Sequence, residues 1–75
     1  MAAEIRAEMV ASVLEIVAAE GAPVADGDTV VLLESMKMEI PVLTEWTGTV
    51  ASIAVAAGDV VQGGDLIAVI ELAES

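Results

Sequence analysis

The 75-residue sequence contains no cysteine and no histidine. The lack of cysteine excludes disulfide bonds and thiolate metal sites. The lack of histidine removes imidazole metal ligands, the commonest general base, and the Ser-His-Asp and Cys-His catalytic arrangements. A chain of this length is near the lower limit for folding around one core. We therefore expect a single domain, residues 1–75, that is stabilised by core packing alone.

Aromatic and basic side chains are almost as scarce. Phe and Tyr are absent, and Trp46 is the sole aromatic residue. The chain has 13 acidic residues but only two basic ones, Arg6 and Lys37, which gives a net charge of −11. Such a surface repels phosphate backbones and has no aromatic platform for bases, so we expect no nucleic-acid partner. We attribute the acidity to solubility, with steering toward basic partner surfaces as the alternative. For Trp46 we predict a packing role.

Long apolar runs are missing as well, although the mean hydropathy is +0.84. The longest uncharged run, residues 46–58, includes two glycines and is shorter than the roughly 20 residues that a membrane-spanning helix needs. Glu4, Arg6 and Glu8 interrupt the region where a signal peptide would be apolar. We expect a cytoplasmic protein that does not associate with membranes.

The sequence aligns with itself, without a gap, when it is shifted by 37 residues. Both halves carry the phrase G-x-x-V-x-x-G-D, as GAPVADGD at residues 21–28 and as GDVVQGGD at residues 58–65. Chance matches among Ala- and Val-rich segments rarely place two glycines and an aspartate in the same register. The pattern indicates a duplicated unit, with repeat halves at about residues 5–36 and 42–73.

Each half has the pattern of β-strands. Residues 10–17 and 48–56 are rich in Val, Ile and Ala, and residues 29–35 and 66–72 are short, nearly continuous apolar runs typical of strands with little solvent on either face. An amphipathic helix over residues 5–21 is the competing interpretation. We reject it because the equivalent segment of the second half contains Gly48 and a β-branched run. The sequence predicts an all-β fold, a flattened barrel or sandwich of two four-stranded antiparallel sheets with pseudo-twofold symmetry.

Lys37 is the only lysine, and it lies between Met36 and Met38 in a predicted hairpin, residues 34–40. Its equivalent under the shift of 37 is Glu74, so a twofold axis places Lys37 at one end of the molecule and both termini at the other. Two-residue hairpin turns favour Asn-Gly or Asp-Gly because both central residues need φ > 0. A Met36-Lys37 turn would therefore retain strain for function. Exposed methionines suit protein recognition; the alternative is that they cap the barrel end.

The segment ESMKME, residues 34–39, resembles the attachment sequence of biotinyl domains, and the repeated glycine phrases resemble the two halves of the biotinyl/lipoyl fold. The resemblance covers about residues 5–72 and is nearest to freestanding, single-domain biotin carboxyl carriers or to the terminal carrier domain of multidomain biotin carboxylases. It implies that a biotin protein ligase attaches biotin covalently to Lys37. It also implies recognition of the flanking residues, which are Glu34, Ser35, Met36, Met38 and Glu39.

The same resemblance implies a non-catalytic carrier that moves carboxyl groups between biotin carboxylase and carboxyltransferase subunits and is monomeric when isolated. Two other functions remain open. A lipoyl carrier has the same fold, but lipoyl domains usually carry Asp-Lys-Ala at this place. An unmodified β adaptor would bind a partner through its Met-Lys-Met tip.

The chain also departs from the family pattern. Members commonly have Ala-Pro where this chain has Ala7-Glu8 and Thr44-Glu45, and Ala11 replaces a glycine. These differences bear on the edges of the strands. The loop at residues 18–24 is too short for the protruding thumb of some carriers, which implies the thumbless type.

Overall fold

The computed structural model describes residues 1–73, and none of these residues is helical. The eight strands are β1 (Ala2–Arg6), β2 (Ala11–Ile16), β3 (Pro23–Val24), β4 (Thr29–Ser35), β5 (Met38–Leu43), β6 (Gly48–Ile53), β7 (Val60–Val61) and β8 (Leu66–Leu72). The predicted all-β fold is confirmed, and β1 and β2 occupy the segment for which a helix was the alternative. Within residues 1–73, no helix is long and apolar enough to cross a membrane.

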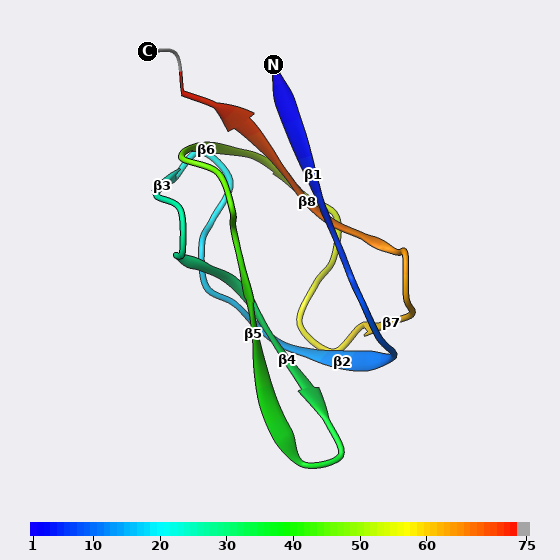
Figure 1. Ribbon diagram of the computed structural model, residues 1–75. Helices are drawn as coiled ribbons and strands as arrows, with labels where there is room; N and C mark the ends of the chain where they lie inside the picture. The colour runs from blue at the N-terminus through cyan, green and yellow to red at the C-terminus, as the bar shows by residue number, and fades with distance from the viewer. Residues whose placement is uncertain (74–75) are drawn as a thin grey trace.

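The strands form two four-stranded antiparallel sheets, ordered β1-β8-β6-β3 and β5-β4-β2-β7 (Figure 1). Adding or subtracting 37 turns one order into the other, and each sheet takes two strands from each half. The register repeats as well: Ala2 lies opposite Glu71 in the first sheet, and Glu39 lies opposite Glu34 in the second. The pseudo-twofold symmetry therefore extends to individual residue pairs.

The core lies between the sheets, and its largest fully buried apolar side chains are Ile67, Ile70, Val30, Val31 and Val50. Simple alternation would send the adjacent residues Val30 and Val31 to opposite faces of β4. A register shift between Thr29 and Val31 inserts an extra residue there, which lets both side chains reach the core. The shift recurs in the β1–β8 pair, so both continuous apolar runs become buried strands.

The recurring Gly-Asp pair forms the turn that leads into each long strand. Gly27 and Gly64 have φ values of 94° and 93°, which side chains disfavour and glycine tolerates. The Asp28 carboxylate accepts a hydrogen bond from the Ala25 N–H at 2.8 Å, and Asp65 accepts one from Gln62 at 2.9 Å. Each aspartate holds its turn closed by accepting from the N–H three residues earlier in the chain, so part of the acidity stabilises the fold.

Ala11 stands where the family resemblance predicts a glycine, and this difference affects the strand pairing. A Cβ atom on Gly48, the equivalent residue in the second half, would collide with the Glu71 carbonyl oxygen, and Gly48 pairs with Leu72 at the end of β8. Ala11 carries that Cβ atom, and the pairing of β2 with β4 begins only at Ser12. The β2–β4 ladder thus ends at Glu34, one residue short of Ser35, which is the last residue of β4 before the hairpin loop.

The molecule is elongated, with principal extents of 40 × 18 × 17 Å. The β4–β5 hairpin projects at one end, and the N-terminus and the end of β8 lie at the other (Figure 1). This arrangement agrees with the symmetry argument for the sole lysine. Glu74, its equivalent in that argument, lies outside the described residues.

Candidate attachment site

Strands β4 and β5 are joined by a loop of only two residues, Met36 and Lys37. The last pair of the ladder is Ser35 opposite Met38. Met36 has a φ of 53° and Lys37 a φ of 65°, and they are the only non-glycine residues of the described chain with positive φ. Positive φ at both central positions is typical of a type I′ turn, and it costs an L-residue roughly 1–2 kcal/mol. The turn is strained at the residue that the sequence singles out.

The three tip side chains are exposed. Lys37 is exposed, and the exposed fractions of Met36 and Met38 are 88% and 60%. The alternative in which the methionines cap the barrel end is therefore wrong. An exposed apolar side chain of this size forgoes roughly 1.5–3 kcal/mol of burial, and flexible thioethers suit recognition surfaces.

The amine of Lys37 is chemically available. The ion pairs among residues 1–73 are Arg6 with Glu4 at 2.8 Å and the N-terminal ammonium with Glu71 at 3.1 Å. Arg6 also donates to the Gly64 carbonyl at 2.8 Å. Within that part of the chain no hydrogen bond or ion pair involves the Lys37 amine. An exposed amine on a protruding turn fits amide formation with the carboxyl group of a cofactor.

The residues that flank the turn lie on two faces of the hairpin, with the two glutamates on one face and Ser35 and Met38 on the other. Glu34 lies directly opposite Glu39, and both are exposed. Like charges in this position destabilise a strand pair. Because side chains alternate along a strand, half-buried Ser35 and exposed Met38 lie on the other face. In the described part of the chain, no group of three or more acidic residues could hold a metal ion.

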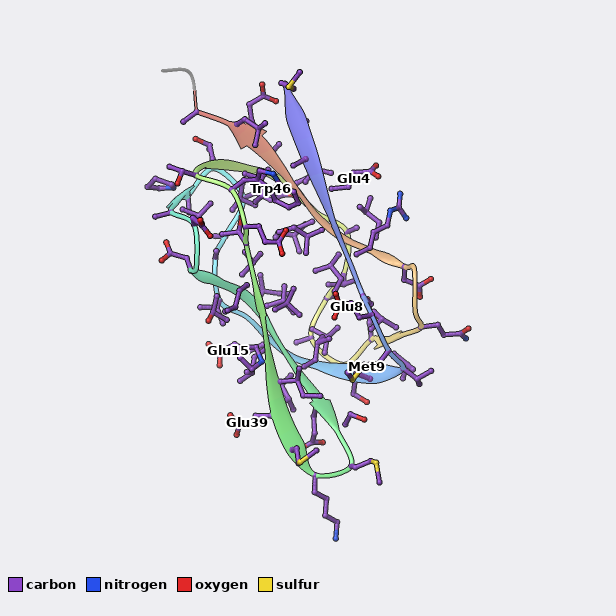
Figure 2. The ribbon with its side chains drawn as sticks, viewed as in Figure 1. Glu4, Glu8, Met9, Glu15, Glu39 and Trp46 are labelled. Carbon is purple, nitrogen blue, oxygen red and sulfur yellow. The ribbon has the colours of Figure 1, made fainter. Side chains whose placement is uncertain are left out.

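A groove that the sequence did not predict lies between β1 and β5, which are one edge strand of each sheet. It has a volume of about 290 Å³, and its lining includes Leu33 and Ile40 toward the hairpin and Trp46 farther away. Figure 2 shows Met9 on the hairpin side and Trp46 near the end that carries the termini. Met9 and Trp46 are equivalent under the shift of 37. A groove lined by two equivalent residues lies on the symmetry axis, so the repeat was the signal in the sequence that could have indicated it.

Trp46 packs against the core as expected. Thr44, the only buried polar residue in the described chain, holds its backbone. The Thr44 hydroxyl donates to the Trp46 carbonyl at 2.8 Å and accepts from the Trp46 N–H at 3.0 Å.

The fold and the tip now allow a comparison with known proteins. The model of the biotin/lipoyl family, described as "Biotin-requiring enzyme", matches residues 1–70. The chain belongs to this family. Two curated relatives are named "Biotinylated protein TB7.3 homolog". The one from Mycobacterium leprae is 61% identical over 93% of this chain and 99% of its own length; the one from Mycolicibacterium smegmatis is 65% identical over 95% and 100%.

Solved structures agree with the biotin/lipoyl assignment. The Kluyveromyces lactis urea carboxylase matches with a TM-score of 0.90 and 38% identity, over 95% of this chain and 6% of that chain. The lipoyl domain of the Azotobacter vinelandii 2-oxoglutarate dehydrogenase complex matches with a TM-score of 0.73 and 24% identity, over 92% of this chain and 99% of that one, and shows the shared fold. Membership of the biotin/lipoyl family makes the chain a carrier domain rather than a catalyst, and the names of its relatives support a biotin carrier role.

Proposed function

We propose that the chain is a biotin carboxyl carrier in which biotin is attached as an amide to the Nζ atom of Lys37. The observation that carries the proposal is the amine of the only lysine, exposed on a strained two-residue turn at one end of a 40 Å domain. In the attachment step the neutral amine attacks the carbonyl carbon of activated biotin. The activating group leaves with the bonding electron pair, and the nitrogen loses a proton.

We assign the recognition of the tip by a biotin protein ligase to the residues around Lys37. Met36 and Met38 offer exposed apolar contacts. Glu34 and Glu39 present two carboxylates on one face of the hairpin, and Ser35 is the last residue of β4 before the turn. A ligase that reads both faces would distinguish this tip from other exposed lysines.

The bound biotin supplies a ureido nitrogen that carries a carboxyl group. The role of this chain is to present that group to a biotin carboxylase and then to a carboxyltransferase, at the high local concentration that tethering gives. The similarity to one small part of a urea carboxylase supports partners of this class. We propose that the isolated chain is monomeric and works in the cytoplasm.

Intact mass spectrometry after co-expression with a biotin ligase tests the attachment. We expect one adduct with the mass of biotin less one water, and none on the Lys37→Arg variant, which keeps the positive charge. An adduct on Lys37→Arg would refute the site, and a lipoyl mass would select the lipoyl carrier.

The methionines need a separate experiment. We expect Met36→Thr and Met38→Ala each to slow ligation severalfold, because each removes apolar contact area at the tip. Val60→Ala is the matched control, since Val60 is also an exposed apolar residue, at 67%, but lies on β7. Unchanged ligation in both methionine variants would remove them from recognition and leave the Lys37 assignment intact.

An unmodified adaptor is the second candidate, because the 88% exposure of Met36 would also serve direct partner binding. Intact mass of the protein from its native cells decides between the two functions. A chain that carries no adduct there would favour the adaptor.

A further inference from the structure

The lining of the groove between β1 and β5 includes residues of the β4–β5 hairpin, which carries Lys37. Leu33 and Ile40, which lie opposite each other on β4 and β5, belong to its lining together with Glu8 and Met9. In Figure 2, Glu8 and Met9 lie between the hairpin and Trp46. The groove volume of about 290 Å³ is just below the range of about 300–1,000 Å³ that small-molecule sites occupy.

An apolar path connects the tip with this end of the groove. Strand alternation places Met38 on the same face of β5 as Ile40. Met38 is 60% exposed, whereas Ile40 is half-buried and packs against the core. Met9, which lines the groove, is 43% exposed. An aliphatic arm on Lys37 that folds back would therefore lie on apolar side chains.

We infer that Glu8, Met9, Leu33 and Ile40 form a resting site for the biotin headgroup carried by Lys37. The inference rests on the proposed attachment. Biotin has a sulfur-containing ring, which fits exposed Met9 and half-buried Ile40 above the buried Leu33, and a ureido ring with two N–H donors. Glu8 is exposed and its carboxylate has no hydrogen-bond partner within residues 1–73, so it is free to accept a ureido N–H.

Tethering makes a weak site sufficient. A group attached through a short flexible arm has an effective concentration on the order of millimolar, so a resting site with a millimolar dissociation constant would be about half occupied. The headgroup would leave readily when a partner active site offers tighter contacts. The resting site would shield the ureido group from solvent between the two partner sites.

The chain contains four methionines, which makes methyl NMR of protein labelled with 13C-methyl methionine a direct test. We expect the Met9 methyl signal to shift on biotinylation and to show nuclear Overhauser contacts with biotin ring protons. Met1 lies at the opposite end of the molecule and is 93% exposed, so its signal should not move. Met36 and Met38 flank Lys37 and report attachment itself.

Glu8→Ala should lower the ratio of docked to free headgroup by about tenfold, as expected for a lost hydrogen bond to a charged group, and reduce the Met9 shift accordingly. Glu45→Ala is the matched control, because Glu45 is the equivalent of Glu8 under the shift of 37 and lines the same groove. It should leave the Met9 shift unchanged.

A Met9 signal that stays as fixed as that of Met1, in protein shown by mass to be fully biotinylated, would overturn the resting site but not the attachment. A mass without biotin would overturn the attachment, and the resting site with it.

Discussion

The hairpin end and the terminal end of the molecule are equivalent under the pseudo-twofold axis, but they are closed in different ways. At the terminal end no loop joins β1 to β8. Instead, Leu72 donates its N–H to the Met1 carbonyl at 2.8 Å. The N-terminal ammonium also pairs with Glu71 at 3.1 Å. The end is thus closed by a hydrogen bond and by opposite charges.

At the hairpin end the two strands are joined by the polypeptide itself, and several local features of this connection lower the stability. Glu34 faces Glu39, Met36 and Lys37 hold positive φ values, and Ala11 shortens the neighbouring ladder. The comparison shows that the repeat supplies the same scaffold at both ends. The differences at the hairpin end cost stability and present the amine.

The largest effect that would test this comparison is expected at Gly48. Gly48→Ala should lower the free energy of unfolding by about 3 kcal/mol, because the new Cβ atom collides with backbone. The reverse change at the equivalent position, Ala11→Gly, should alter it by less than about 1 kcal/mol. Urea denaturation of both variants measures the difference, and equal effects would show that the two ends are packed alike.

Thr44→Val should cost about 2 kcal/mol, since it removes the hydroxyl that bonds the Trp46 N–H and carbonyl. Its symmetry equivalent is Ala7, which has no hydroxyl, so the effect belongs to one half only. Thr49→Val, at an exposed threonine, is the control. A shift of the unfolding midpoint no larger than that of the control would contradict the role of Thr44.

Lys37→Gly should raise the free energy of unfolding by about 1 kcal/mol while abolishing modification, because glycine relieves the positive φ at the turn. Lys37→Ala also loses the amine but keeps the strain, so it should not be stabilised. Thermal unfolding of the two variants compares them directly. Equal stability would mean that the turn stores no strain at this residue.

The smallest effect is expected from the paired carboxylates. Glu39→Gln should stabilise the domain by about 0.5 kcal/mol, because it removes a like charge opposite Glu34. The gain should shrink in high salt, which screens exposed charges. Unfolding curves at low and high ionic strength measure it, and a gain independent of salt would point to a cause other than charge.

Much of the architecture could be predicted because each half repeats the same local chemistry. Gly27 and Gly64 occupy positive-φ turns, and Asp28 and Asp65 close those turns. These interactions join residues that lie within four positions of each other, so they can be predicted from the sequence. The two-residue loop at Lys37 is equally local.

Features that depend on distant pairing could not be predicted. The groove exists because β1 and β5 lie at edges of different sheets. No local sequence pattern indicates which strands lie at an edge. Thr44 resembles any surface threonine until its burial is known. The extra residue at Val30 is also set by the register of β4 against β5, and alternation alone gives no sign of it.

The projection of the hairpin away from the N-terminus and from the end of β8 (Figure 1) has a consequence for protein architecture. A polypeptide that enters and leaves such a unit on one side can be lengthened there without crowding the reactive end. The same fold can then serve as a separate small protein or as a module spliced into a large multifunctional chain. Orientation, rather than sequence length, is what makes the unit portable.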